Sequence, residues 1–181
     1  MKEIIICVDE NDKELGYIEK MDAHIKGVLH RALSIFIFNE KNELLLQKRY
    51  SGKYHSPSLW TNTCCTHPNK NESTDSAAKR RLQEEMGFSC DLNEVFSFMY
   101  YIKFDNNLIE HEFDHVYFGR YSDKVYINPL EVEDYKWISI NEIKTDLQNN
   151  PQKYSYWFRF FMENHIKEIE ENLDFLIYII Y

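Results

Sequence analysis

Residues 74–85 constrain the fold of this chain more than any other stretch of the sequence. The segment contains no Gly or Pro, is rich in Ala, Arg, Gln and Glu, and is followed by Gly87. Such a composition favours an α-helix, and the glycine is typical of a helix C-terminus. Arg81 and Glu85 stand at i and i+4, so their side chains share one face. We therefore expect a well-defined helix that presents a cation beside a carboxylate.

Strands are predicted on both sides of this helix. Runs rich in β-branched and aromatic residues give way to Asn, Asp and Gly, which is typical of strands joined by turns. The expected strands are residues 3–8, 33–38, 44–48, 95–104, 110–121 and 131–138. Turns are expected over residues 9–16, 39–42 and 105–107, the last two closing hairpins.

Two further helices complete the predicted secondary structure. Residues 141–147 indicate a short helix, and residues 154–173, which follow Pro151, form a long amphipathic stretch typical of a helix. Strands interleaved with helices, several joined as hairpins, predict an α/β (α+β) fold in which helices cover a mixed β-sheet. The chain has 181 residues and no linker-like, repeated or low-complexity tract, so residues 1–181 are expected to form a single domain.

The charge of the chain limits its partners. A formal net charge of −9 argues against sequence-independent nucleic-acid binding, which requires a basic face, so no nucleic-acid partner is expected. Two local clusters of cations could still hold a small anion, although solvated surface side chains are the ordinary explanation for most of them. These cations are Lys48, Arg49, Lys53, Lys79, Arg80 and Arg81.

The cysteines and the apolar C-terminal segment bear on location. Four cysteines without a disulfide-type pattern, and no secretory pattern at the start of the chain, predict a reducing, cytoplasmic compartment. Residues 175–181 are apolar but far fewer than the roughly 20 residues that span a bilayer, so no stable membrane insertion is expected. We expect this segment to pack on the domain or on a partner subunit, the protein being a monomer or a homodimer.

Three histidines and two glutamates are candidates for a metal site. Glu110 and Glu112 stand two apart on a predicted strand and point to the same face, where a shared cation would relieve their repulsion. His111, between them, should face the opposite way. From the residues alone, hydrogen-bonded histidines and surface carboxylates remain the commoner explanation. The candidate donors, which suit an octahedral or distorted divalent ion, are His24, His30, His67, Glu110 and Glu112.

The predicted helix and the residues before it resemble the Nudix box, G-x5-E-x7-R-E-U-x-E-E-x-G-U, in which U is a bulky apolar residue. Two positions depart, because Thr66 replaces the first glycine and Arg81 replaces the glutamate after the arginine. In a Nudix hydrolase the glutamates of this helix gather Mg²⁺ ions that activate water against a diphosphate. Arg81 thus removes a metal ligand and adds a charge that can bind phosphate. The matching residues are Glu72, Arg80, Leu82, Glu84, Glu85, Gly87 and Phe88.

Within the Nudix superfamily, this departure resembles the type I isopentenyl diphosphate isomerases. The resemblance implies a Nudix fold, with a mixed sheet flanked by helices and a long C-terminal helix. It also implies an isomerase of isoprenoid biosynthesis, an intramolecular oxidoreductase that converts isopentenyl diphosphate reversibly to dimethylallyl diphosphate. Further segments in that family's order and approximate spacing are residues 19–24, 29–34, 59–62, 65–68, 110–112 and 155–157.

The resemblance also implies roles for individual side chains. The reaction adds a proton to an unactivated alkene and removes one two carbons away, so it needs an acid, a base, stabilised positive charge and exclusion of water. By resemblance Cys65 and Glu112 transfer the protons, Tyr100 assists Glu112, and Trp157 offers its ring to the carbocation-like state. Cys64 is not expected to be catalytic. The five candidate donors are implied to hold one divalent ion, Mn²⁺, Mg²⁺ or Zn²⁺.

A prenyl diphosphate is the small-molecule partner that the resemblance implies. Its diphosphate is implied to lie against four cations and to bring a Mg²⁺ ion that Glu85 helps to hold. Arg80 is expected to organise Glu72 instead. His55 and His115 match no ligand position of the family. The implied diphosphate-binding residues are Lys20, Arg49, Lys53 and Arg81.

Two other functions remain open at this point. A Nudix hydrolase would use the same fold and Mg²⁺ to cleave a nucleoside or prenyl diphosphate, but Arg81 and the pair of Cys65 and Glu112 argue against it. A non-catalytic module would use the histidines to hold a structural ion. That function would leave the cationic set and Trp157 unexplained.

Overall fold

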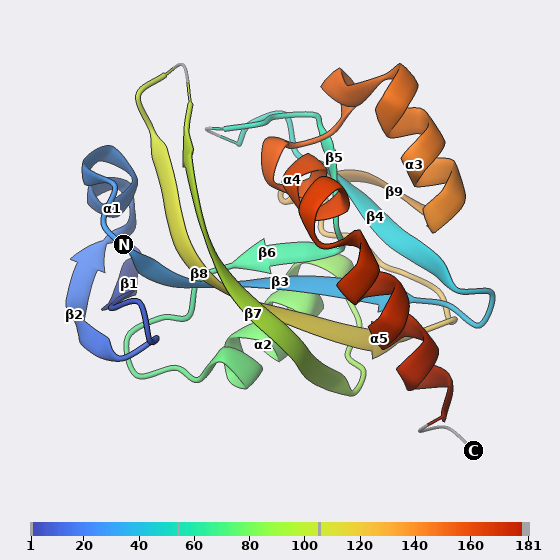
Figure 1. The fold of residues 1–181 in the computed structure, drawn as a ribbon, viewed down its shortest axis with the longest axis horizontal. Coiled ribbons are helices and arrows are strands. Elements are labelled where there is room, and N and C mark those ends of the chain that lie inside the picture. The colour runs from blue at the N-terminus through green and yellow to red at the C-terminus, as the bar shows by residue number, and fades with distance from the viewer. Residues whose placement is uncertain (1, 54, 105, 179–181) are drawn as a thin grey trace.

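The computed structural model describes residues 2–53, 55–104 and 106–178, and the backbone alone for residues 174–178 (Figure 1). The elements are β1 (Ile4–Val8), β2 (Glu14–Glu19), α1 (Lys20–Lys26), β3 (His30–Phe38), β4 (Glu43–Arg49), β5 (Trp60–Thr61), β6 (Cys64–Thr66), α2 (Thr74–Met86), β7 (Leu92–Lys103), β8 (Ile109–Arg120), β9 (Val132–Ser139), α3 (Ile140–Asn149), a 3-10 turn (Pro151–Lys153), α4 (Tyr156–Asn164) and α5 (Ile166–Tyr178). All the described strands belong to one sheet, and helices lie on both of its faces. The predicted mixed sheet flanked by helices is confirmed.

β3 organises the sheet. Along one edge it pairs in parallel with β8, from His30 opposite Glu112 to Phe38 opposite Arg120. Its other edge pairs antiparallel, in turn, with β1, β6 and β4. β8 also forms a long antiparallel hairpin with β7, in which Tyr100 lies opposite Glu112. These registers bring side chains from distant parts of the chain to one end of β3.

The buried side chains of β3 alternate between two hydrophobic cores. Leu33, Ile35 and Ile37 belong to the core that α2 covers. Phe36 and Phe38 belong to the core formed with α3, α4 and α5 on the other face. Because both faces of β3 are covered, its sequence is apolar almost throughout instead of alternating with polar residues.

α2 confirms the predicted helix and its stop signal. The Ser73 side chain caps the N-terminus by accepting a backbone hydrogen bond from the first turn. Gly87 ends the helix in the left-handed region, with φ 74°. A Cβ at this position would lie 2.2 Å from the carbonyl oxygen of Tyr126, so both the space and the backbone require glycine. The fixed end of α2 sets the position of Arg81 and Glu85 against the sheet.

The C-terminal region departs from the prediction of one helix over residues 154–173. The 3-10 turn is followed by α4 and α5, with a break at His165, where φ is −124° and ψ is 18°. The His165 ring centroid lies 4.1 Å from that of Phe98 on β7 and 6.0 Å from that of Phe160. Packing on these aromatic rings overrides the local helical pattern. The expectation for residues 175–181 concerns side chains outside the described part of the chain.

Most other expected elements are confirmed with shifted ends. The turn predicted for residues 9–16 is shorter, because Asp9 Oδ1 accepts two backbone hydrogen bonds and β2 already begins at Glu14. β3 and β4 pair only at Phe38 and Leu44, and then diverge. The β7–β8 turn includes residue 105, which is outside the described residues. α1, β2, β5 and β6 carry no clear signal in the sequence.

In the part of the chain that the structure describes, every helix is too short or too polar to cross a membrane.

Candidate active site

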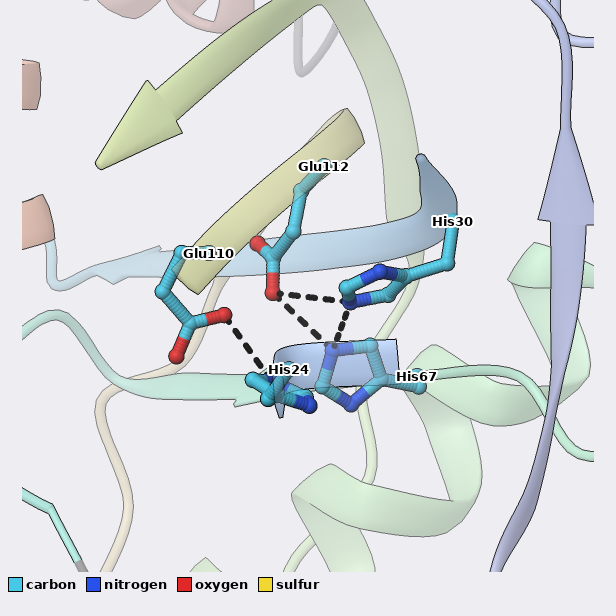
Figure 2. Close-up of side chains that lie close together, drawn as sticks. All are labelled: His24, His30, His67, Glu110 and Glu112. Atoms are coloured by element: carbon cyan, nitrogen blue, oxygen red, sulfur yellow. Dashed lines mark hydrogen bonds and ion pairs between the residues drawn. The ribbon is translucent and has the colours of Figure 1, made fainter. Parts of the chain in front are cut away.

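Five buried donors from three elements and one loop converge at one end of β3 (Figure 2). One ligand atom from each lies within 4.8 Å of the others. His24 Nε2 of α1 is 3.0 Å from Glu110 Oε2 of β8. His67 Nε2, in the loop after β6, is 2.9 Å from Glu112 Oε1 and 3.2 Å from His30 Nε2. The five candidate donors selected from the sequence therefore form one cluster.

The orientation of the imidazoles fits a divalent cation. His24 Nδ1 lies 2.6 Å from the carbonyl oxygen of Lys20, and His30 Nδ1 lies 2.8 Å from that of Val28. An Nδ1–H that donates to each carbonyl leaves the Nε2 lone pair facing the cluster. His67 Nε2 faces the same space, 3.2 Å from His30 Nε2 and 2.9 Å from Glu112 Oε1. The donor set is therefore of the kind that holds a divalent metal.

Burial and mutual charge perturb the titration of these carboxylates and imidazoles. Burial, together with the charge of Glu112, raises the pKa of Glu110 to about 7. Burial alone would raise the pKa of Glu112, but the neighbouring imidazoles of His30 and His67 hold it well below its usual value. Burial lowers the pKa of His67 well below its ordinary range. A cation bound among these donors would balance the charge of the two adjacent buried carboxylates.

Cys65 lies on β6, opposite Ser34 of β3. Its Sγ donates to Asn62 Oδ1 at 3.1 Å and lies 3.6 Å from Ser34 Oγ. The amide nitrogen of Asn62 donates to two backbone carbonyls, which turns its oxygen toward the thiol. Burial, and then the charge of Asp114, raises the pKa of Cys65 to about 12. The thiol is therefore held protonated and in a fixed direction.

Glu112 is contacted from both sides. The Tyr100 hydroxyl donates to Oε2 across the β7–β8 hairpin, and Oε1 faces the imidazoles. Burial raises the pKa of Tyr100 well above its usual value, so the hydroxyl remains a donor. Asp114 lies on the same face of β8, two residues further, and accepts a hydrogen bond of 2.8 Å from Ser34 Oγ. Asp114 was missed in the sequence, although its alternation with Glu110 and Glu112 was the available signal.

A cavity of about 440 Å³ opens beside these groups. Its wall includes Cys65, Glu112 and Tyr100, together with Trp157 of α4. Glu85 of α2 lines it on the side of the cations. The four cations selected from the sequence, Lys20, Arg49, Lys53 and Arg81, also line the cavity. The structure thus brings the proposed proton-transfer pair, the aromatic side chains and the cationic set to one space.

The α2 side of the cavity is a network of charges. Arg81 donates to Glu85, as the i and i+4 spacing predicts, and its NH2 group lies 3.2 Å from Glu131 Oε2. Glu131 also pairs with Lys53. Glu85 is buried, and Gln47 Nε2 orients its Oε2 at 2.7 Å. Glu131 and Gln47 were not selected from the sequence, because no local pattern links them to α2.

Trp157 is buried in the cavity wall. The guanidinium carbon of Arg49 lies 5.0 Å from its ring centroid, so the indole face already receives a cation. The His55 ring contacts the indole edge-on with a centroid distance of 5.3 Å, and His55 Nε2 is 3.4 Å from Glu110 Oε1. Burial, and then the charge of Arg49, lowers the pKa of His55 to about 3. His55 is outside the metal cluster, as expected, but it lines the cavity, which the sequence did not indicate.

The other residues singled out in the sequence support the site or lie away from it. Arg80 binds both carboxylate oxygens of Glu72, at 2.6 and 2.8 Å. Glu72 in turn accepts a backbone hydrogen bond of 2.8 Å from Asn69. The expected organising role of Arg80 is confirmed, since this network holds the loop before α2. His111 and His115 have their partners outside the cluster.

Comparisons with known proteins agree over most of the chain. The model of the NUDIX domain matches residues 28–158. Isopentenyl-diphosphate Delta-isomerase 1 of Aromatoleum aromaticum is 49% identical over 172 residues, which cover 95% of this chain and 97% of that protein. The isopentenyl-diphosphate Delta-isomerase of Pectobacterium atrosepticum is 50% identical over 155 residues, which cover 86% of this chain and 87% of that protein.

Solved structures show the same fold. The MutT protein from Methanosarcina mazei has a TM-score of 0.63 at 21% identity, covering 80% of this chain and 95% of that one. The MutT NUDIX hydrolase from Burkholderia pseudomallei has a TM-score of 0.58 at 18% identity, covering 76% and 98%. At such identities the likeness concerns the fold alone, whereas the family model and the isomerases match in sequence. The chain therefore belongs to the NUDIX family and, within it, to the isopentenyl-diphosphate Delta-isomerases.

Proposed function

We propose that this protein converts isopentenyl diphosphate reversibly to dimethylallyl diphosphate by moving a C=C bond, as a step of isoprenoid biosynthesis. The observation that carries this function is the meeting of Cys65 and Glu112 at one cavity with a set of cations. Residues 1–181 act as one domain. A reducing cytoplasmic location is supported by the four cysteines, all of which are free among the described residues.

Two divalent ions belong to the proposed site. The cluster of His24, His30, His67, Glu110 and Glu112 holds Mn²⁺, Mg²⁺ or Zn²⁺, for which its nitrogen and oxygen donors are suited. When bound, this ion neutralises the two carboxylates and stabilises the ionised form of Glu112. Glu85, which Gln47 orients, would hold a Mg²⁺ ion brought by the diphosphate, since Mg²⁺ prefers phosphate oxygens together with few protein carboxylates.

Proton transfer needs an acid and a base on opposite sides of the alkene. In the forward direction one proton is added to the terminal CH₂ carbon, and one leaves the CH₂ group on the far side of the tertiary carbon. One of Cys65 and Glu112 donates and the other accepts, so the pair carries the same number of protons before and after. The raised pKa of Cys65 supports a neutral thiol at rest, and Tyr100 supports Glu112 by its hydrogen bond.

The cavity walls stabilise the carbocation-like state that forms between the two proton transfers. A cation–π contact with the Trp157 ring contributes about 2 kcal/mol when the cation is desolvated. Each 1.4 kcal/mol corresponds to about tenfold in rate, so this contact would be significant. Burial of the reacting groups also excludes the water that would trap a carbocation. Lys20, Arg49, Lys53 and Arg81 hold the diphosphate, with the arginines offering paired donors.

Hydrolysis of a nucleoside or prenyl diphosphate is less well supported. Arg81 stands where the Nudix box has a glutamate, and it neutralises Glu85 instead of adding a metal ligand. A hydrolase would also have no use for a buried thiol beside the metal cluster.

The direct test is proton NMR of the purified protein with isopentenyl diphosphate and Mg²⁺ in D₂O. We expect dimethylallyl diphosphate that carries deuterium, without released phosphate. Phosphate release would favour the hydrolase, and an unchanged spectrum would remove the proposed function.

The proton-transfer pair is tested by Cys65→Ala and Glu112→Gln. Both variants should lose nearly all turnover and still bind inorganic pyrophosphate in calorimetry, since neither side chain belongs to the cationic set. Cys90→Ala is the matched control, because this cysteine is only partly buried and lies outside the cavity lining. Substantial turnover by either site variant would show that the protons move through other groups.

A further inference from the structure

Glu131 lines the cavity but has no part in the chemistry proposed above. It directly precedes β9, and its Oε2 pairs with Lys53 Nζ and lies 3.2 Å from Arg81 NH2. These two side chains belong to the set that would hold the diphosphate. Glu131 is not a member of the metal cluster. A negative charge therefore sits where a more strongly charged anion has to bind.

The backbone around Glu131 is held from two sides. Its carbonyl oxygen accepts a hydrogen bond of 3.1 Å from Tyr50 N, and its own N–H donates to Asn128 O at 3.0 Å. Asn128 N donates in turn to the carbonyl oxygen of Glu85 at 2.9 Å. Glu131 is thus tied to the segment after β4 and to the end of α2, the two elements that supply its cationic partners.

The cations of the cavity wall face carboxylates of the same wall. The lining contains as many glutamates as lysines and arginines together. Burial alone would raise the pKa of Glu131, but the hydrogen bond from Lys53 and the charge of Arg81 hold it below its usual value. Glu131 is therefore an anion at neutral pH. Lys20 is neutralised in the same manner, since its Nζ lies 3.2 Å from both carboxylate oxygens of Glu3.

We propose that Glu131 is an internal competitor of the diphosphate, which displaces its carboxylate from Lys53 and Arg81 on binding. This inference rests on the proposed function of the cavity. The ligand needs donor atoms that Glu131 occupies, so each binding event breaks these ion pairs and each release restores them. Substrate and product carry the same diphosphate. Without the competing carboxylate of Glu131, the cations would bind both more tightly and release the product more slowly. Glu131 thus sets the affinity of the site for diphosphates.

Titration calorimetry with inorganic pyrophosphate and Mg²⁺ tests this competition. Glu131→Gln should bind pyrophosphate roughly two- to thirtyfold more tightly, the range expected when two partly exposed ion pairs, with Lys53 and Arg81, no longer compete. Glu131→Asp keeps the charge and should stay within about twofold of the unchanged protein. Glu133→Gln is the matched control, because Glu133 lies two residues further along and pairs with Lys48, outside the cavity lining.

Steady-state kinetics give an independent readout. In Glu131→Gln the KM for isopentenyl diphosphate should fall by a similar factor, while kcat stays the same or falls because release is slower. Unchanged or weaker pyrophosphate binding by Glu131→Gln would overturn the inference, as would equal tightening by Glu131→Asp. A protein without isomerase turnover would refute the proposed function, whereas the pyrophosphate series would still decide the role of Glu131.

Discussion

Replacing Tyr100 by Phe isolates the hydroxyl group that contacts Glu112. In the structure this hydroxyl donates to Glu112 Oε2, while Oε1 faces His67. The ring should keep its place in the variant, because Phe98 and Phe160 stack on it with centroid distances of 5.7 Å. The substitution therefore removes one hydrogen bond and leaves the packing of β7 on α4 intact.

The expected effect follows from the charge on Glu112. A hydrogen bond to a charged group contributes about 1.5 to 3 kcal/mol, and each 1.4 kcal/mol changes a rate about tenfold. The bond is already present at rest, and only the part of it that strengthens in the transition state affects kcat, so we expect kcat for isomerisation to fall by at most roughly 150-fold in Tyr100→Phe. The KM should change less than about twofold, because Tyr100 is not among the side chains proposed to hold the diphosphate and uniform binding is retained.

The assay is the initial rate of dimethylallyl diphosphate formation over a range of substrate concentrations. Tyr101→Phe is the control, since the Tyr101 side chain is 58% exposed and its ring contacts His111 on the opposite face of the hairpin. A kcat within about twofold of the unchanged protein would refute the support of Glu112 by Tyr100. Equal losses in both variants would show that the hydroxyl contact is not the cause.

Two further predictions concern the metal and the response to acid. Metal content, measured by mass spectrometry after purification, should fall sharply in His67→Ala and hardly in His111→Ala. Equal loss of metal in both variants would show that His67 is not a metal ligand. The hydrogen bond from Arg80 lowers the pKa of Glu72 below its ordinary value of 4.5, so its stabilising contribution is present above that pH and is lost as the pH falls through the folded-state pKa. The free energy of unfolding in urea should thus decline less on acidification in Glu72→Gln, and parallel pH curves for both proteins would contradict this reasoning.

Much of the fold and of the site could be predicted because the relevant signals are local. The composition of α2 and the glycine after it depend on helix propensity and on a left-handed backbone, which neighbouring residues largely determine. The shared face of Glu110 and Glu112 follows from the period of a strand, and that of Arg81 and Glu85 from the period of a helix. The family motif, with its order and spacing, then indicated which distant residues belong to the same site.

Other features could not be predicted because they depend on contacts between segments that are far apart in the chain. The break at His165 arises from aromatic packing on β7, which outweighs a helical pattern without Gly or Pro. His55 and Glu131 lie in loops that line the cavity. The conformation of a loop cannot be predicted from a periodic sequence pattern. Asp114 has a periodic signal, but only the pairing of β3 with β8 and β6 places it beside Ser34 and Cys65.

The sequence by itself thus determined the chemical groups of this protein, its family and the helix that carries its charges, since these depend on residue type and short-range geometry. Tertiary structure alone decided which groups touch. The antiparallel and parallel registers of β3 set the distances among the imidazoles, the carboxylates and the thiol. Those distances in turn produce the opposite pKa shifts of Glu110 and Glu112, because burial and hydrogen bonding act only once the chain has folded.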